Sequence, residues 1–362
     1  MVINELSLTQ FRNFETQSLA PHAGVNLIYG DNGSGKTSLI EAIYCLGFGR
    51  SFRPGSFRQL VRHGADALTL FAVCHDEQQS RTDRIGLRRT LQGDLQLRIN
   101  REDEKRFAAI ARLVPVQLMT PESIELVLGG PKFRRQFIDW GVFHVEQQFY
   151  RDWLSFSKLL KQRNSLLKQR RWHKEGKYWD DQLSLYGERV NTHREQYVIG
   201  LESVIDKVLS VFLPEYEFKF DLKSGWDKGL GYAEAIQKHQ EQDLRYGHTT
   251  VGPHKAEFRL LANGEDARNL LSRGQLKLLV AALKLVQGNY FYEKTGRRCI
   301  YLVDDLAAEL DAQNQVKFSD ALMKTGSQVF VTSISAQGIM AGIDAGNAKM
   351  FHVEHGKLKE DN

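Results

Sequence analysis

The sequence predicts an α/β fold: a head built on a mixed β-sheet and interrupted by a mainly helical insertion lobe. An apolar run over residues 25–29 leads into a glycine-rich loop that opens a helix. A second continuous apolar run, over residues 299–303, is typical of a buried parallel strand. Between them, helical periodicity dominates from about residue 132 to residue 210. The boundaries that we expect are 1–114 and 246–362 for the head and 115–245 for the insertion.

The composition is that of an ordinary globular protein, with 42% hydrophobic and 26% charged residues among 362. That length is sufficient for two domains, each with its own core. The net charge of +5 tolerates a polyanionic partner but does not require one. The chain begins with no basic-then-apolar leader and has no run of 18 apolar residues, so we expect a cytoplasmic protein with no membrane span. Cys45, Cys74 and Cys299 are far apart in apolar stretches, which favours buried thiols over a disulfide framework or a zinc site.

The first 30 residues are expected to form two strands. Residues 2–14 mix polar and apolar side chains in a strand-like pattern, and residues 19–30 bring a second strand to the glycine-rich loop. The loop therefore lies between a strand and a helix.

Residues 30–37 have the spacing of a phosphate-binding P-loop. Their glycines let backbone N–H groups approach phosphate oxygens, and the helix N-terminus adds partial positive charge. We expect Lys36 to reach the β- and γ-phosphates of a nucleotide and to act in catalysis, and the Thr37 hydroxyl to be a ligand of Mg²⁺. The alternative, a chance match to a turn, is disfavoured by the strand before the loop and the helix after it. The expected nucleotide-binding residues are Gly30, Asp31, Asn32, Gly33, Ser34, Gly35, Lys36 and Thr37.

After this helix we expect a loop and then an antiparallel sheet. Residues 47–55 are basic and glycine-rich; they lie either near the nucleotide or at the surface, and the second position is favoured. Residues 68–74, 85–90 and 95–101 alternate as strands do, and residues 92–94 supply the turn between the last two.

The helical insertion mixes cations with aromatic rings. Cations on a helix with rings nearby suit contacts with a phosphate backbone and exposed bases. The alternative is that the rings belong to the core and the cations to a solvated face, and the sequence leaves both open. The basic residues are Lys132, Arg134, Arg135, Arg151, Lys158, Lys161, Arg163, Lys168, Arg170, Arg171 and Lys174, and the rings are Phe149, Tyr150, Trp153, Trp172, Tyr178 and Trp179.

Strands return after the insertion. Residues 216–222 and 257–262 are expected to be strands, and Asn263-Gly264 is a strong hairpin signal. A helix then opens at Ser272-Arg273-Gly274-Gln275. Its Ser-x-x-Gln pattern is a capping box, and a helix N-terminus of this kind is also an anion site. The two interpretations are compatible.

The strand at residues 299–303 ends in two aspartates. Ligands bind at the carboxyl ends of parallel strands, so both carboxylates are expected beside the phosphates. Asp304 would hold Mg²⁺ through a water, and Asp305, pointing to the other side, would act as the base toward an attacking water. The alternative is a solvated turn.

These motifs resemble those of ABC-type ATPases. Residues 271–275, Asp304-Asp305 and residues 308–311 are similar to the signature, Walker B and D-loop of that superfamily. The resemblance implies an ABC-type P-loop ATPase head that binds ATP with Mg²⁺. It also implies an ATP-bound homodimer, in which the signature helix of one subunit completes the ATP site of the other. The residues that it assigns to the nucleotide are Ser272, Arg273, Gly274 and Gln275.

Three further stretches narrow the resemblance to the RecF family of bacterial recombination mediators: residues 11–14, residues 129–135 with Asp139, and residues 250–254. The similarity spans essentially the whole chain. It implies an SMC-like head without the long coiled coil, and binding of single-stranded, gapped or junction DNA together with RecO and RecR. It also implies roles in DNA repair, replication restart, RecA loading and the SOS response.

The chain departs from the transporter pattern at the catalytic positions. Asp305 stands where transporters have Glu, Ser333 stands at the switch position where they have His, and Gln117 is only a candidate for the Q-loop glutamine. We therefore expect slow, DNA-stimulated ATP hydrolysis that acts as a release timer. A soluble ABC transporter subunit and a P-loop kinase of a small metabolite remain as alternatives; the second leaves the signature helix unexplained.

Overall fold

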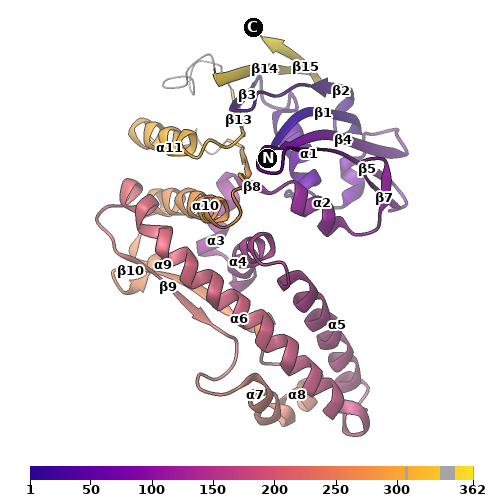
Figure 1. Ribbon diagram of the computed structural model, residues 1–362, viewed down its shortest axis with the longest axis vertical. Coiled ribbons are helices and arrows are strands. Elements are labelled where there is room, and N and C mark those ends of the chain that lie inside the picture. Colours follow the sequence, from indigo (N-terminus) through magenta and orange to yellow (C-terminus); the bar gives the residue numbers. More distant parts are fainter. Residues whose placement is uncertain (306–308, 335–346, 362) are drawn as a thin grey trace. The chain divides into compact units, whose positions relative to one another are not determined.

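The computed structural model describes residues 1–305, 309–334 and 347–361, with the side chains of residues 173–175 left aside. The chain forms two compact units, residues 1–123 with 281–362 and residues 124–280. Each is described by itself below (Figure 1).

Two six-stranded sheets form the first unit. One is antiparallel, in the order β2-β1-β4-β5-β6-β7, and the other is mixed, in the order β15-β14-β3-β13-β12-β8. The antiparallel sheet comprises β1 (Val2–Phe11), β2 (Phe14–Leu19), β4 (Ala67–Asp76), β5 (Arg81–Thr90), β6 (Leu95–Ile99) and β7 (Glu102–Glu104). The mixed sheet comprises β3 (Val25–Tyr29), β8 (Val116–Met119), β12 (Ile300–Val303), β13 (Val329–Ser333), β14 (Ala348–Glu354) and β15 (Lys357–Asp361).

The centre of the mixed sheet is parallel and buried. β13 lies between β3 and β12, and all three run parallel to one another. Every residue of β12 is buried, as its continuous apolar sequence predicts. Because the three strands are parallel, the loops that follow them emerge at one edge of the sheet.

The core of the first unit lies between the two sheets and around α1 (Lys36–Phe48). Side chains from β1 and β4 of the antiparallel sheet and from β3 and β12 of the mixed sheet belong to one buried cluster, together with Leu39 and Ile40 of α1. The first unit also contains η1 (Phe57–Leu60), α2 (Phe107–Leu113), α11 (Ala312–Lys324) and the later part of α10 (Arg273–Thr295).

The second unit is mainly helical. Figure 1 shows the 41-residue helix α6 (Trp172–Phe212) alongside α5 (Phe149–Lys168). A three-stranded antiparallel sheet, β11-β10-β9, completes the unit. Its other elements are α3 (Glu125–Leu128), α4 (Pro131–Val145), β9 (Phe218–Lys223), α7 (Tyr232–Lys238), α8 (Gln240–Tyr246), η3 (Pro253–Lys255), β10 (Glu257–Ala262), β11 (Glu265–Asp266) and α9 (Ala267–Leu270), and η2 (Pro121–Ile124) spans the boundary.

Most predicted elements are confirmed, including the antiparallel strands and the helices of the insertion. The hairpin at Asn263-Gly264 is also confirmed, since both residues have positive φ and join β10 to β11. The N-terminal segment differs: β1 ends at Phe11 and turns into β2 before the strand that enters the glycine-rich loop. All three cysteines are buried and free, as predicted.

The unit boundaries differ from the expected 114/115 and 245/246. Residues 115–123 lie in the first unit because β8 pairs with β12. Residues 246–280, which we expected in the head, lie in the second unit because β10 pairs with β9 over six residue pairs. Sheet pairing between segments distant in sequence decides both boundaries.

Candidate nucleotide-binding site

The glycine-rich loop connects β3 to α1 in a conformation that requires glycine. Gly30 and Gly35 have φ of 143° and 126°, outside the range that L side chains normally adopt. A Cβ at Gly30 would lie 2.3 Å from the Val353 carbonyl oxygen, and one at Gly35 would lie 2.6 Å from Asn13 Nδ2. Glycine is therefore required at both positions for the loop to adopt this backbone and to pack against these neighbouring segments.

Lys36 forms hydrogen bonds within the glycine-rich loop. Its Nζ donates to the carbonyl oxygens of Gly30 at 2.7 Å and Asp31 at 3.0 Å. The first N–H groups of α1 receive no side-chain cap, and the buried Ser34 hydroxyl has no hydrogen-bond partner among the described residues. Unpaired donors beside a lysine at a helix N-terminus form a site for an anion.

Two segments distant in sequence support the loop from behind. Asn13 Nδ2 and the Gly356 backbone N–H both donate to the Ser34 carbonyl oxygen, at 2.8 and 3.0 Å. Asn13 lies in the turn between β1 and β2, and Gly356 in the turn between β14 and β15. Both turns orient the Ser34 peptide.

Asp304 follows the last residue of β12 and faces the start of α1. Its Oδ1 accepts hydrogen bonds from Thr37 Oγ1 at 3.2 Å and Thr332 Oγ1 at 2.9 Å. Burial raises the pKa of Asp304 to about 6; the hydroxyls of Thr332 and Thr37 favour the charged form, and the Asp305 carboxylate opposes it. A threonine hydroxyl beside a carboxylate fits Mg²⁺, which prefers oxygen ligands and keeps several waters. These are the two residues that the sequence assigns to the metal.

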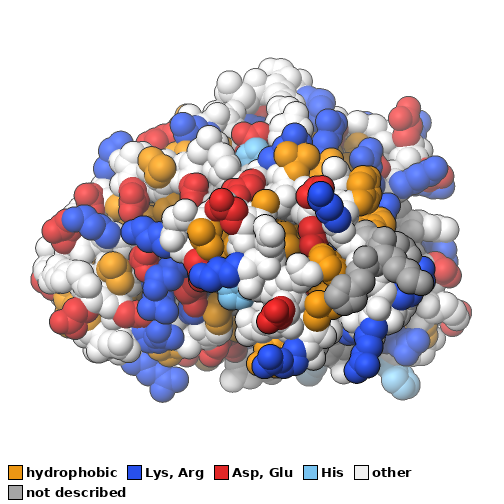
Figure 2. Space-filling view, turned by 90° about the horizontal axis from the view of Figure 1, so that it is seen from below, with side chains coloured by type: hydrophobic (Ala, Val, Ile, Leu, Met, Phe, Trp, Pro, Cys, Tyr) orange, Lys and Arg blue, Asp and Glu red, His pale blue; other side chains and the backbone are white. Residues whose placement is uncertain are grey.

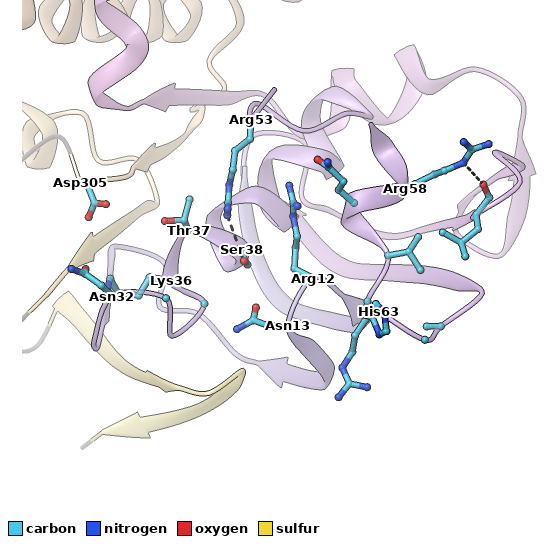
Figure 3. Close-up of a pocket in the computed structure, with 18 residues that line it drawn as sticks. Arg12, Asn13, Asn32, Lys36, Thr37, Ser38, Arg53, Arg58, His63 and Asp305 are labelled. Carbon is cyan, nitrogen blue, oxygen red and sulfur yellow. Dashed lines mark hydrogen bonds between the residues drawn. The ribbon is translucent and has the colours of Figure 1, made fainter. Parts of the chain in front are cut away.

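Asp305 diverges from Asp304, although not by strand alternation. β12 ends at Val303, and Asp305 has a left-handed backbone with φ of 54°. Its N–H donates to Thr332 Oγ1 at 3.0 Å, and its exposed side chain lines the same cavity as Lys36 and Thr37. Figure 3 shows Asp305 across from Asn32 and Thr37. A positive φ at a non-glycine residue is a strained arrangement that often marks a functional position.

The cavity has a volume of about 860 Å³ and extends well beyond the glycine-rich loop. Lys36, Thr37 and Asp305 lie at one end, and Arg58 and His63 lie at the other (Figure 3). The rest of the cavity is lined by polar and basic side chains that the sequence analysis did not assign to the nucleotide. They are Arg12, Asn13, Arg53, Arg58, Arg62 and His63.

Arg53 corrects one sequence-based interpretation. It belongs to the connection at residues 47–55, for which the sequence favours a surface loop over a position near the nucleotide, yet it lines the same cavity as Lys36 and Thr37. Its NH2 lies 3.5 Å from the Ser38 hydroxyl in the first turns of α1. The basic composition of residues 47–55 is the sequence feature that could have indicated a place beside the glycine-rich loop.

The predicted capping box at the start of α10 is confirmed. Ser272 N–H donates to Gln275 Oε1 at 2.9 Å, and Gln275 N–H donates to Ser272 Oγ at 3.3 Å. Gln275 Nε2 also donates to Glu215 at 3.1 Å. Ser272, Arg273 and Gly274 are exposed at the surface of the second unit, where another molecule can reach them.

The candidates for the Q-loop, the switch position and the D-loop lie in three different parts of the chain. Gln117 is buried in β8 and donates to Gln287 at 2.8 Å, so it does not line the cavity with the glycine-rich loop. Ser333 is the last residue of β13. Of the expected D-loop, Ala308 lies outside the described residues, and Asp311 caps α11 by accepting from the Asn314 N–H at 2.9 Å.

Part of the basic face of the insertion is structural. Arg134 forms a bidentate ion pair with Glu257, and the fully buried Arg163 contacts Asp180 and Asp243. Phe149 belongs to the core. Lysines and arginines that stay exposed include Lys158, Lys161, Lys168 and Arg170, and Trp153 and Tyr178 are exposed rings.

No helix in the described part of the chain is both long and apolar enough to cross a membrane. The described residues also contain no cluster of three or more His, Cys, Asp or Glu side chains placed to hold a metal. The Asp304 carboxylate and the Thr37 hydroxyl, which are joined by a hydrogen bond, remain the candidate protein ligands for Mg²⁺.

Fold and site together define an SMC-like P-loop ATPase head. A sequence model of the family described as RecF/RecN/SMC N terminal domain matches residues 2–359. The DNA replication and repair protein RecF of Idiomarina loihiensis is 48% identical over 99% of this chain and 100% of its own length. The RecF of Shewanella amazonensis is 43% identical over 99% of each chain. The chain therefore belongs to the RecF family.

Solved structures agree with this assignment. A structure of the recombination mediator protein RecF-ATP in the RecFOR pathway superposes with a TM-score of 0.88 at 28% identity, covering 100% of this chain and 98% of the other. An Smc head bound to the C-winged helix domain of ScpA superposes with a TM-score of 0.62 at 15% identity, covering 100% and 97%. The second comparison shows the shared head fold.

Proposed function

We propose that this chain is a cytoplasmic, ATP-dependent DNA-binding protein of recombinational repair. ATP with Mg²⁺ closes a homodimer on single-stranded, gapped or junction DNA, and the dimer acts with RecO and RecR to load RecA, supporting replication restart and SOS induction. The observation that carries the proposal is the convergence of four residues. Lys36, Thr37 and Asp305 line one end of the cavity, and the buried Asp304 accepts a hydrogen bond from Thr37. Membership of the RecF family supports it, and so do solved structures of RecF with ATP or its analogue.

Each residue of the site has a task that follows from its chemistry. Lys36 is bound to loop carbonyls, and exchanging these for phosphate oxygens needs only a small movement of its flexible stem. The backbone N–H groups of the glycine-rich loop and of α1 donate to the same phosphates. Thr37 and Asp304 would hold Mg²⁺, which when bound neutralises phosphate charge. Asp305 would accept a proton from the attacking water.

The dimer rests on the exposed start of α10. Ser272 and the Gly274 N–H lie at a helix N-terminus that its own unit leaves open to solvent. A phosphate presented by another copy would meet hydroxyl and N–H donors there. ATP would then stabilise the dimer because it binds more tightly to the closed arrangement than to the monomer, and hydrolysis would release it.

DNA contacts are assigned to exposed cations rather than to the whole basic stretch of the insertion. Lys158, Lys161, Lys168 and Arg170 are exposed on α5 and directly after it, and Trp153 offers an exposed ring. In Figure 2, Lys and Arg side chains are interspersed with Asp and Glu across the face shown. Because Lys and Arg contacts with phosphates release counterions, DNA binding should weaken steeply as salt rises.

A gel-shift assay with gapped DNA, with and without ATP, tests the proposal. We expect ATP-dependent binding at low salt that falls as salt rises, and sedimentation should show a dimer only with ATP and Mg²⁺. An absence of DNA binding at low salt would overturn the DNA-binding part. The transporter alternative has no observation in its favour beyond the ABC-type motifs, since the relatives described above are RecF proteins.

A further inference from the structure

Glu41 is a fully buried carboxylate in the helix that begins with Lys36. It accepts two hydrogen bonds from Arg12, from Nε and NH2, each at 2.7 Å. It also accepts from the Ser51 hydroxyl and lies 3.4 Å from Arg53 NH2. Arg12 and Arg53 both line the cavity, so two cations of the cavity wall share one buried anion.

The charges in this cluster do not balance. One carboxylate faces two guanidinium groups, which leaves a net positive charge on this wall of the cavity. Because Glu41 is desolvated, its pairing with Arg12 is strong and directional. The side chains of Arg12 and Arg53 keep 19% and 36% of their surface exposed, so each guanidinium can still donate into the cavity.

The backbone places this wall next to the glycine-rich loop. Arg12 has a left-handed backbone with φ of 52°, and its N–H donates to the Leu60 carbonyl at 2.8 Å. The next residue, Asn13, donates to the Ser34 carbonyl of the loop. The turn that carries Arg12 is therefore tied to the loop on one side and to η1 on the other, and a strained backbone is kept in place by its contacts.

Ser51 joins Arg53 to the same carboxylate. Its hydroxyl donates to Glu41 and accepts from the Arg53 N–H at 2.8 Å. Glu41 thus orders a stretch of the connection at residues 47–55 as well as the turn at Arg12. Figure 3 shows Arg12 and Arg53 between the Lys36 end and the His63 end of the cavity.

We propose that Glu41 is a positioning residue of the nucleotide site, which holds the guanidinium groups of Arg12 and Arg53 ready for the phosphates of a nucleotide. The ligand class is a nucleoside polyphosphate, because the cations of this wall continue the positive charge of Lys36 and of the α1 N-terminus. This inference rests on the proposed nucleotide-binding function. Glu41 itself touches no ligand; it acts through the two arginines.

The test measures ATP affinity by calorimetry in the full-length protein. Glu41→Gln keeps the size of the side chain and removes its charge, so we expect ATP affinity to fall about tenfold, on the order of one lost charge-assisted hydrogen bond. Asp76→Asn is the matched control. Asp76 is another buried carboxylate of the same unit, paired with Arg297 at 2.7 Å and absent from the cavity lining. It should leave ATP affinity within twofold of the wild type.

A double-variant comparison separates positioning from general stability. In an Arg12→Ala, Arg53→Ala background, Glu41→Gln should change ATP affinity by less than twofold, because the groups through which it acts are gone. An equal loss in both backgrounds, or unchanged affinity in Glu41→Gln, would overturn the inference.

If Glu41→Gln does not fold, Arg12→Lys serves instead. It keeps the charge but cannot form the bidentate pair, and it should lower ATP affinity by a similar factor; wild-type affinity in this variant would contradict the inference. A wild-type protein that binds no ATP would overturn the proposed function itself. The two failures are therefore distinguishable.

Discussion

The Thr37 hydroxyl lies 3.2 Å from the Asp304 carboxylate, although 267 positions separate the two residues in the chain. Strand order explains this closeness. β13 lies between β3 and β12 in a parallel arrangement, so the segments that follow β3 and β12 emerge at the same edge. The candidate metal ligands are thus positioned by the sheet and not by a local motif.

Replacing Lys36 should weaken nucleotide binding itself. Lys36→Met removes the cation that faces the phosphates while keeping most of the stem, so we expect ATP affinity to fall about 100-fold. Equilibrium dialysis with labelled ATP measures the change. Lys324→Met, at an exposed position in the last turn of α11, is the control and should bind as the wild type does. Equal affinity in both variants would contradict the role given to Lys36.

Asp304 should destabilise the nucleotide-free protein at neutral pH. Its folded-state pKa, raised by burial to about 6, lies above the ordinary value of 3.8, so the folded state binds the proton more tightly than the unfolded state. Stability therefore decreases as pH rises from about 4 to about 6 and stays reduced above that range. Asp304→Asn should raise the free energy of unfolding by about 3 kcal/mol at pH 8, and the gain should vanish near pH 4.

Chemical denaturation across that pH range provides the measurement. Asp320→Asn is the matched control, because Asp320 is exposed on α11 and its replacement should change stability little. A gain for Asp304→Asn that does not depend on pH would contradict this account of the buried charge.

The exposed start of α10 should matter for the dimer and not for the monomer. Ser272→Ala combined with Arg273→Ala should abolish ATP-driven dimerisation, while ATP binding by the monomer stays within about twofold. Sedimentation velocity with a non-hydrolysable ATP analogue reports both states. Arg268→Ala, on neighbouring α9, is the control and should still dimerise. Loss of ATP binding together with the dimer would mean that these residues act within their own subunit.

Asp305 should control how long the dimer lasts. Asp305→Asn removes the proposed base, so ATP should still close the dimer and the closed state should persist at least tenfold longer than in the wild type. A chase with excess ADP, followed by light scattering, gives the lifetime. We also expect wild-type turnover far below tens per second with DNA present, and a faster rate would contradict a release timer.

Arg163 should be essential for the stability of the second unit. It is fully buried between Asp180 and Asp243, and its NH1 also donates to the Thr249 hydroxyl at 2.9 Å. Arg163→Met would leave two carboxylates uncompensated, and we expect the free energy of unfolding to fall by about 3–5 kcal/mol. Arg170→Met, at an exposed position, should change it by less than about 0.5 kcal/mol. Urea unfolding of both variants tests the difference.

Residues 30–37 could be predicted from the sequence to form a P-loop, because that motif depends only on residues that are neighbours in the chain. A strand, a glycine loop and a helix N-terminus need only neighbouring residues, and the same holds for the capping box at Ser272 and Gln275 and for the turn at Asn263-Gly264. The buried strand before Asp304 could also be predicted, since continuous apolar character needs no partner to be recognised. The family resemblance then supplied the function that we propose for these motifs.

Only the tertiary structure decided which cations line the cavity. Arg163 and Arg53 look equally basic in the sequence, yet one is enclosed by carboxylates, the nearer of which is 17 positions away, and the other lines the cavity. Whether a charged side chain is paired depends on groups that folding brings together. A cation enclosed by carboxylates contributes to stability, whereas a cation that stays partly exposed in a cavity is available to bind a ligand. The pairing of Glu41 with Arg12 could not be predicted from the sequence for the same reason. It forms only because folding brings α1 next to the turn that carries Arg12.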